Sequence, residues 1–248
     1  MIKYFKQFSD WVNGLEFRNH YKQNTFDQKI DSLISNHNCK TILEIGGNNR
    51  PIINKKKYPT IHLAGVDPDI QLDEGCLTQN GVYDDFSLCE FKNYETEEKY
   101  DLILMDMVFE HIENNTTTLN KISSMLKNGG YFITHNPSNL HPYALINQAL
   151  PQGLKIRILK LFRPWSQVGV ITGWPSHYHL CNYLTLRAEA KKKKLEAIDG
   201  ICSYNASDYF AFFPPLFFLI VIYEEIIKFF KLELLCSDYW VLFKKRDN

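Results

Sequence analysis

Short apolar runs alternate with amphipathic stretches through the middle of the chain, from about residue 40 to residue 137. Runs of β-branched and apolar residues predict buried strands, whereas apolar residues spaced three and four positions apart predict helices. The predicted strands cover 41–45, 61–66, 81–86, 100–106 and 131–137. A helix over 116–127 is expected to end at Asn128-Gly129-Gly130 in a left-handed cap. This alternation predicts an α/β fold with a doubly wound, mostly parallel sheet.

The regions on either side of this core are mainly helical. Residues 1–38 are expected to form two amphipathic helices, the first of which breaks near Asn13-Gly14. Residues 138–180 form a helical insertion rich in aromatic residues and prolines, which is expected to build the substrate side of a cleft. The remaining predicted elements are a helix over 182–195 and strands over 196–203 and 239–244, so that 1–248 form a single domain.

The segment 209–232 is largely apolar and precedes the last predicted strand. Spanning a bilayer needs about 20 uninterrupted apolar residues, and Pro214-Pro215 interrupts this run, so no transmembrane helix is predicted. A helix that packs on the sheet is the simplest interpretation. A lid over an apolar substrate and a peripheral contact with a membrane are the alternatives.

Composition narrows the possible partners and the compartment. Lys plus Arg and Asp plus Glu both number 28, so the formal net charge is zero and no basic stripe favours nucleic acid. The six cysteines are dispersed, with no Cys-x-x-Cys pair, which favours reduced thiols over a disulfide framework or a zinc site. The N-terminus lacks the continuous apolar core of a signal peptide. A cytoplasmic protein is therefore expected.

The stretch from Thr41 to Pro51 gives the first sign of a ligand site. The buried strand ends in Gly46-Gly47-Asn48, a turn that can adopt positive φ and present backbone N–H groups. The next predicted strand ends in Asp67. Such an arrangement is suited to a nucleoside, because the carboxylate can accept hydrogen bonds from the two ribose hydroxyls.

Five motifs in one order resemble the class I S-adenosylmethionine-dependent methyltransferases. They are Leu43-Glu44-Ile45-Gly46-Gly47, Gly65-Val66-Asp67, Tyr100-Asp101-Leu102-Ile103, Phe109-Glu110-His111-Ile112 and Met125-Leu126-Lys127-Asn128-Gly129-Gly130. Each motif alone is weak, but the ordered series is specific. Downstream, Asn136-Pro137-Ser138 and His177-Tyr178-His179 are similar to members that act on small molecules or on glycan and lipid precursors of the cell envelope. The resemblance implies a Rossmann-like sheet of seven strands, of which only the last is antiparallel.

The resemblance also implies a site for S-adenosyl-L-methionine at the strand ends. Glu44 would reach toward the amino group of the methionine moiety, and Gly46-Gly47 would let the backbone pass close to it. Asp67 would hold the ribose hydroxyls, and Asp85, or its neighbour Asp84, would contact the adenine amino group. The implied cofactor-binding residues are Glu44, Gly46, Gly47, Asn48, Asp67, Pro68, Asp85, Phe86, Asp106 and Met107.

Two features depart from the family pattern. Asn48 and Arg50 stand where the family commonly carries glycine, although asparagine tolerates left-handed φ better than most residues. Some relatives bind a metal through an acid three residues before the Glu-His pair. That position is Met107 here, so no metal is expected.

Methyl transfer to a hydroxyl oxygen requires removal of the acceptor proton, and histidine suits this role near neutral pH. The candidate catalytic residues are His111, His135, Tyr178 and His179, with His177 beside the last two. Structural roles stay open as well, since His111 is also placed to orient the following helix and His135 to satisfy the sheet edge.

The preferred interpretation is an S-adenosylmethionine-dependent methyltransferase that O-methylates a small metabolite or a sugar- or lipid-linked precursor. An NAD-dependent oxidoreductase is the first alternative, but residues 48–60 leave little room for the helix that a dinucleotide pyrophosphate requires. A catalytically silent, methyltransferase-like binding module is the second. Contact of 209–232 with lipid would place the protein at the inner face of the membrane.

Overall fold

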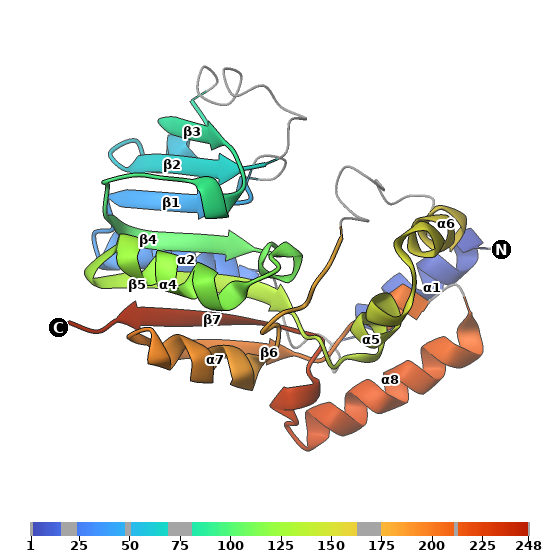
Figure 1. The fold of residues 1–248 in the computed structure, drawn as a ribbon. Coiled ribbons are helices and arrows are strands. Elements are labelled where there is room, and N and C mark those ends of the chain that lie inside the picture. Colours follow the sequence, from blue (N-terminus) through green and yellow to red (C-terminus); the bar gives the residue numbers. More distant parts are fainter. Residues whose placement is uncertain are drawn as a thin grey trace.

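A seven-stranded sheet forms the centre of the protein in the computed structural model (Figure 1). The structure describes residues 2–15, 24–47, 51–68, 81–162, 175–210 and 213–247. The strands are β1 (Thr41–Ile45), β2 (His62–Asp67), β3 (Asp85–Leu88), β4 (Tyr100–Asp106), β5 (Leu126–Pro137), β6 (Leu195–Ser203) and β7 (Asp238–Lys245). Their order is β3-β2-β1-β4-β5-β7-β6, and β7 runs antiparallel to both of its neighbours. The predicted mostly parallel sheet with an antiparallel last strand is confirmed.

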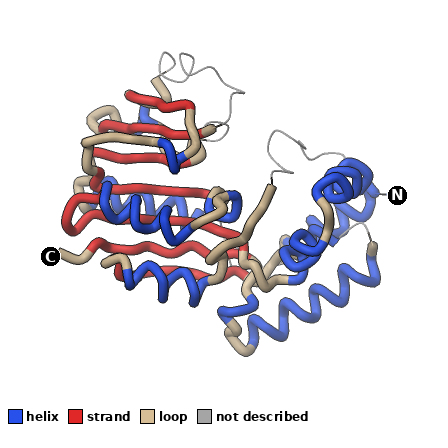
Figure 2. Tube along the Cα trace, viewed as in Figure 1, coloured by secondary structure: helices blue, strands red, loops and turns tan. Residues whose placement is uncertain are grey.

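Helices pack on the sheet and also form a separate group at one end of it (Figure 2). Those that pack on the sheet are α2 (Asn24–Asn36), α4 (Asn115–Met125) and α7 (Tyr183–Lys192). The separate group, which we call the helical cap, contains α1 (Ile2–Asn13), α5 (Pro142–Ala149), α6 (Gln152–Phe162), η5 (Ser207–Phe210) and α8 (Pro214–Phe229). Short 3-10 helices are η2 (Lys55–Lys57), η3 (Phe91–Asn93), η4 (Phe109–His111) and η6 (Glu233–Leu235).

Alternation of side chains along the strands creates a hydrophobic core on each face of the sheet. Leu43 in β1 belongs to the cluster that also contains Leu119 of α4. Its neighbour Ile42 belongs to the cluster on the other face, with Phe26 and Leu33 of α2. Both faces are covered, as expected for a parallel sheet whose strands read as continuous apolar runs.

The structure corrects the predicted third strand. β3 begins at Asp85, where the prediction placed its end, and runs to Leu88. The residues before it form a turn whose Gly81 has a φ of 66°. Asp85 is therefore the first residue of β3 and Asp84 directly precedes it, so both lie at the edge of the sheet opposite the carboxyl ends of the parallel strands.

The predicted glycine cap of the fourth helix is also wrong. α4 ends at Met125, and β5 begins at the next residue, Leu126, which pairs with Tyr100. Gly129 has the expected left-handed φ of 70°, but it lies within β5, where the register with β4 shifts. The glycine thus accommodates an irregularity in the strand and not the end of the helix.

The helical cap is anchored through both apolar and polar contacts. Phe217 of α8 is fully buried, and its ring lies 5.9 Å from that of Phe8 in α1. The buried Glu224 accepts a hydrogen bond of 2.6 Å from the Ala206 backbone N–H. No helix within the described ranges is both long and apolar enough to cross a membrane.

Candidate active site

The carboxyl ends of the parallel strands bring several of the predicted cofactor residues to one edge of the sheet. β1 lies between β2 and β4, so the strand order reverses direction at this point. In α/β proteins such a switch point opens the crevice in which ligands bind. Gly46 follows β1, Asp67 ends β2 and Asp106 ends β4.

The two glycines after β1 are required by close packing. Gly46 has a φ of 85°, and a Cβ atom there would lie 2.2 Å from Cγ2 of Val108. A Cβ on Gly47 would lie 2.3 Å from the Tyr83 hydroxyl and 2.5 Å from Oε1 of Glu44. The backbone therefore passes against side chains at a distance that only glycine permits. Asn48, the third predicted residue of this turn, lies outside the described residues.

Glu44 binds the backbone of the loop that follows the two glycines. Its side chain is buried, and Oε1 accepts a hydrogen bond of 2.7 Å from the Ile52 backbone N–H. Burial raises the pKa of Glu44 to about 7, against the opposing effect of the Ile52 and Ile53 N–H groups. The second oxygen, Oε2, is buried with no hydrogen-bond partner among the described residues. A buried carboxylate oxygen of this kind is suited to accept from an ammonium group.

Asp67 lies at the tip of β2, where the sequence predicted it. Only 8% of its surface is exposed, and its negative charge contributes, after burial and Glu44, to the raised pKa of the Tyr83 hydroxyl. Glu44, Asp67 and Tyr83 thus share one buried polar region beside the glycine turn. Pro68 follows directly and is exposed.

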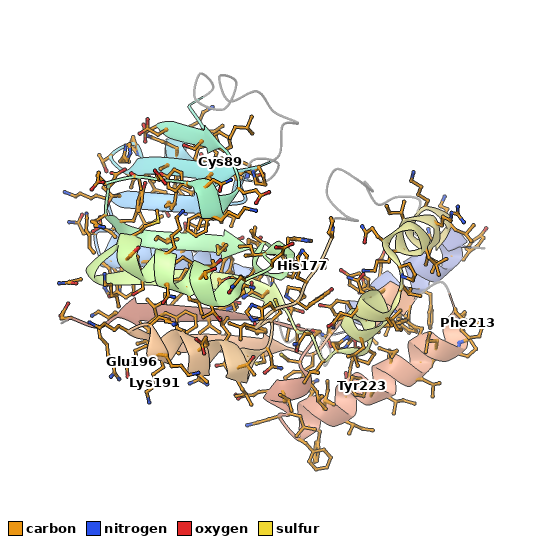
Figure 3. All side chains as sticks on the ribbon, viewed as in Figure 1. Cys89, His177, Lys191, Glu196, Phe213 and Tyr223 are labelled. Atoms are coloured by element: carbon orange, nitrogen blue, oxygen red, sulfur yellow. The ribbon has the colours of Figure 1, made fainter. Side chains whose placement is uncertain are left out.

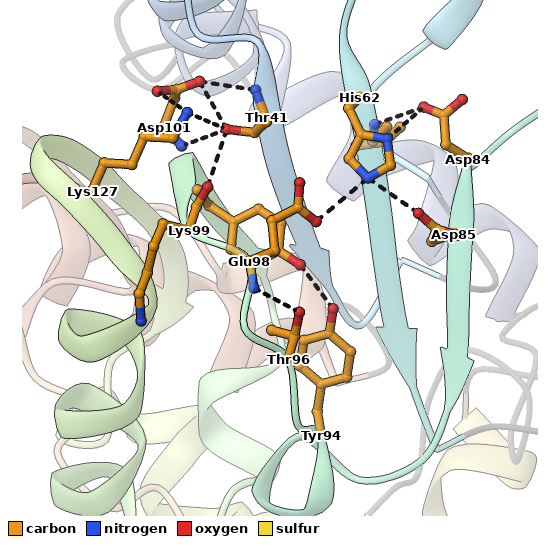
Figure 4. A network of polar contacts seen from close by, with 12 residues as sticks. Thr41, His62, Asp84, Asp85, Tyr94, Thr96, Glu98, Lys99, Asp101 and Lys127 are labelled. Atoms are coloured by element: carbon orange, nitrogen blue, oxygen red, sulfur yellow. Dashed lines mark hydrogen bonds and ion pairs between the residues drawn. The ribbon is translucent and has the colours of Figure 1, made fainter.

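Asp84, Asp85 and Phe86 do not reach this edge. Asp85 is paired in register with Ala64, near the start of β2, and its largely exposed carboxylate lies 3.1 Å from Nε2 of His62 (Figure 4). Asp84 accepts from the Leu63 backbone N–H at 2.8 Å. Phe86 is buried within the core. The predicted contact of Asp85 with the adenine amino group and the place of Phe86 among the cofactor-binding residues do not fit this geometry, because both residues begin the strand instead of ending it.

The carboxyl end of β3 carries different residues. Leu88 is the register partner of Asp67, and Cys89 follows it directly (Figure 3). Val82 and Tyr83 precede the acidic pair and Phe86 and Leu88 follow it, so the sequence alone does not show which apolar residues form the strand. This end of β3 is therefore the side of the crevice that an adenine ring would approach.

His135 links the ends of three strands through two carboxylates. Its Nδ1 lies 2.7 Å from Oδ1 of Asp106, and its Nε2 lies 3.3 Å from Oδ1 of Asp238. Its backbone carbonyl accepts a hydrogen bond of 2.9 Å from Met107 N–H. Met107 has a φ of 55°, which is an unfavourable conformation for a residue with a side chain. Strained backbone of this kind is common at functional sites.

This environment argues against His135 as a general base. Burial alone would lower the pKa of His135, but the hydrogen bonds and charges of Asp106 and Asp238 outweigh it and raise the pKa to about 10. The imidazole is therefore protonated at neutral pH and cannot accept a further proton. Its role is to hold the two carboxylates and, through its carbonyl, the Met107 backbone.

Glu110 is a functional candidate that the sequence interpretation missed. It follows β4 within η4, is 6% exposed, and its Oε2 has no hydrogen-bond partner among the described residues. Burial raises the pKa of Glu110, while the interactions with His111 and His135 oppose that shift. Its backbone carbonyl accepts hydrogen bonds from the N–H groups of His177 (2.7 Å) and Tyr178 (3.2 Å). The insertion is thus tied directly to the end of β4 (Figure 3).

His111 has a defined tautomer. Its Nδ1 lies 2.6 Å from the Pro175 carbonyl oxygen, which can only accept, so Nδ1 donates. In the neutral imidazole Nε2 is then unprotonated, and it lies 3.7 Å from Oε1 of Glu110. A partly exposed histidine with one nitrogen fixed by a carbonyl and the other beside a carboxylate has the features of a general base.

The contacts of Tyr178 and His179 argue against either residue as a general base. The buried hydroxyl of Tyr178 accepts from Nδ2 of Asn147 at 2.9 Å, and burial raises its pKa, so it keeps its proton. Nδ1 of His179 accepts from the Asn115 backbone N–H at 2.9 Å, at the start of α4. His179 therefore stabilises the N-terminus of a helix. The structure does not support either residue as a base.

No cluster of three or more His, Cys, Asp or Glu side chains within the described ranges could hold a metal ion. Among the cysteines that the structure describes, Cys39, Cys181, Cys202 and Cys236 are free.

Comparisons with known proteins identify the class to which this fold and site belong. N-methyltransferase NodS from Bradyrhizobium japonicum WM9, solved with S-adenosyl-L-homocysteine, has a TM-score of 0.54 at 12% identity, covering 98% of this chain and 99% of NodS. The plantazolicin methyltransferase BpumL has a TM-score of 0.56 at 13% identity, covering 99% of this chain and 98% of BpumL. The cyclopropane synthase MmaA2 from Mycobacterium tuberculosis has a TM-score of 0.50 at 12% identity, covering 83% and 78%. These similarities establish the class I methyltransferase fold.

The family follows from the sequence. Residues 18–196, more than half of the chain, match the family described as Methyltransferase domain, and the chain belongs to this family. A search of proteins with curated functions finds no significant match. The protein is an S-adenosylmethionine-dependent methyltransferase, as the ordered motifs predicted, and the NAD-dependent oxidoreductase alternative is excluded.

Proposed function

We propose that the protein transfers a methyl group to a hydroxyl oxygen of a small metabolite or of a sugar- or lipid-linked precursor. The observation that carries this proposal is the fixed tautomer of His111, whose Nδ1 donates to the Pro175 carbonyl at 2.6 Å. A hydroxyl acceptor must lose a proton, and Nε2 of His111 is free to take it. The neighbouring Glu110 carboxylate would stabilise the resulting imidazolium, as carboxylates commonly do beside catalytic histidines.

The residues at the sheet edge fit the cofactor. The orphaned buried oxygen of Glu44 and the glycine turn beside it are the two observations that support a methionine ammonium there. Asp67 would accept hydrogen bonds from the ribose hydroxyls, and the backbone of Met107 would line the methionine end. Pro68 borders the ribose in this proposal. When bound, S-adenosylmethionine supplies an electrophilic methyl group on a sulfonium.

Separate residues of this chain would position the site, orient the acceptor and remove its proton. The His135 imidazolium fixes Asp106 and, through its carbonyl, the strained Met107. Tyr178 retains its proton and is held by Asn147, so it can donate a hydrogen bond to an acceptor oxygen and orient it. The proton of the acceptor hydroxyl would pass to Nε2 of His111. In a direct displacement of the methyl group from the sulfonium, the protein must orient the acceptor and remove its proton, and these residues would do both.

The helical cap favours an acceptor with an apolar portion. The ring of Tyr143 in α5 stacks on that of Tyr209 in η5, with centroids 4.9 Å apart. Asn147, also in α5, donates to Tyr178 beside η4, so the cap is connected to the proposed acceptor side. This continuity supports a lipid-linked precursor and a peripheral contact of 209–232 with a membrane.

The test is methyl transfer from labelled S-adenosylmethionine to a small-molecule and lipid extract, followed by identification of the methylated atom. His111→Asn should reduce turnover roughly 100- to 10,000-fold, the usual contribution of a general base, with unchanged affinity for S-adenosylhomocysteine. His37→Asn is the matched control, because His37 is exposed after α2, and it should retain full turnover. Methylation of nitrogen or carbon, or full turnover by His111→Asn, would refute the proposal.

A further inference from the structure

α8 is largely apolar, and its charged residues Glu224, Glu225 and Lys228 lie in its C-terminal half. Its inner side buries Phe217, Ile220 and Ile227, together with Glu224. The outer side repeats the pattern with Phe218 (50% exposed), Ile222 (56%), Ile226 (50%) and Phe229 (80%). A helix of a water-facing surface carries polar residues on its outer side, so an apolar outer side indicates that something covers it.

α1 extends this apolar surface. Tyr4 and Trp11 are 72% and 62% exposed, and Phe8 lies between them on the same side of the helix. The ring of Phe8 lies 5.8 Å from that of Trp11 and 5.8 Å from that of Phe218. The two helices therefore present one continuous surface. We call it the apolar cap face and define it as Tyr4, Phe8, Trp11, Phe218, Ile222, Ile226 and Phe229.

The helices of the cap carry more basic than acidic residues. α6 contains Lys155, Arg157 and Lys160 and no acidic residue, and it also exposes Leu154 and Leu161. The four helices α1, α5, α6 and α8 together carry six Lys and Arg residues against three acids, one of which is the buried Glu224. The whole chain is formally neutral, so the cap holds a local excess of positive charge.

We propose that the apolar cap face docks on the surface of a lipid bilayer that contains anionic lipid. Aromatic side chains beside lysine and arginine are typical of helices that lie in a membrane interface. α8 has 16 residues, about 24 Å at 1.5 Å per residue, which suits a helix lying in the plane. In a symmetric dimer through this face, the basic side chains of both copies would repel each other. The inference rests on the proposed function, since a lipid-linked acceptor would be presented at this surface.

The test is flotation of the purified full chain with vesicles of phosphatidylcholine alone and of phosphatidylcholine mixed with phosphatidylglycerol. Wild type should bind the mixed vesicles more strongly. The variant Phe218→Ser/Ile222→Ser/Phe229→Ser should bind about 100-fold more weakly, because three half-exposed apolar side chains no longer enter the interface. The control Leu184→Ser/Ile198→Ser removes comparably exposed apolar side chains from α7 and β6 and should bind like wild type.

A second variant keeps the inference testable should the serine variant fold poorly. Arg157→Glu/Lys160→Glu reverses two exposed charges on α6 and should weaken binding to the mixed vesicles at least about 10-fold, without affecting folding. Absence of vesicle binding by wild type, or equal binding by the serine variant and its control, overturns the inference. A concentration-dependent dimer that the serine variant abolishes would assign the face to a second copy instead.

Affinity for S-adenosylhomocysteine separates the two proposals. A protein that binds the nucleoside but not vesicles refutes the membrane inference alone. A protein that binds neither refutes the donor site on which the proposed function depends.

Discussion

The carboxyl edge of the sheet buries charged side chains, whereas the helical cap exposes large apolar ones. At the edge, charged side chains are buried, among them Glu44 (1% exposed), Asp67 (8%) and His135 (6%). In the cap, large apolar side chains are exposed, with Trp11 at 62% and Phe229 at 80%. Exposed apolar surface costs free energy unless it is covered, and at the edge Oε2 of the buried Glu44 has no hydrogen-bond partner among the described residues. The difference indicates a polar ligand at the edge and an apolar surface at the cap.

The largest effect should come from breaking the charge cluster at the edge. His135→Gln leaves the carboxylates of Asp106 and Asp238 without their cation, and we expect a loss of about 3 kcal/mol in the free energy of unfolding at neutral pH. Chemical denaturation of wild type and variant measures this loss. His37→Gln, at an exposed position where the imidazole contacts Tyr131, is the control and should lose much less stability than His135→Gln.

The pH dependence of the same variant sharpens the comparison. The pKa of His135 is about 10 in the folded protein, above its ordinary value of 6.5. A raised folded-state pKa means that the stabilisation is complete below about pH 6.5 and disappears as the pH rises toward 10. The difference in stability between wild type and His135→Gln should therefore shrink between neutral pH and pH 10. A difference that stays constant over this range would show that His135 is not held as a cation.

Replacing a glycine by alanine should have opposite effects on stability at the edge and in the cap, and both effects should be smaller than that of His135→Gln. Gly46→Ala places a Cβ 2.2 Å from Val108 at a φ of 85°, and should destabilise the fold by roughly 2–3 kcal/mol. Gly153→Ala in α6 has no atom within 4 Å of its added Cβ, and should stabilise by up to about 1 kcal/mol. Thermal unfolding of the two variants tests this contrast. Equal effects would mean that the turn after β1 is not tightly packed.

The sequence predicted the sheet and most of its edge because the strand ends are marked locally. An apolar run that stops at Gly46 or Asp67 places the next residue at the carboxyl edge in any parallel sheet. β3 was misplaced because it has only four residues and the acidic pair Asp84-Asp85 lies at its start. A short strand with acids at one end does not reveal which end that is.

The catalytic interpretation depended on contacts between distant segments and was less accurate. His135 is separated by 103 residues from Asp238, and the sequence gives no indication that the two meet. Glu110 and His111 were visible as a motif, but their links to Pro175 and His177 cross the insertion. The outer side of α8 was visible as apolar sequence, yet its exposure depends on what packs beside it.

Calorimetric titration with S-adenosylhomocysteine, and with NAD in parallel, tests the central claim most directly. Wild type should bind the former in the micromolar range and not the latter. Asp67→Ala should lose roughly 1.5–3 kcal/mol of binding free energy, about 10- to 150-fold, because a charged acceptor of two hydrogen bonds is removed. Asp85→Ala, at the opposite end of its strand, should bind like wild type. Unchanged affinity in Asp67→Ala, weakened affinity in Asp85→Ala, or preferential binding of NAD would contradict the account.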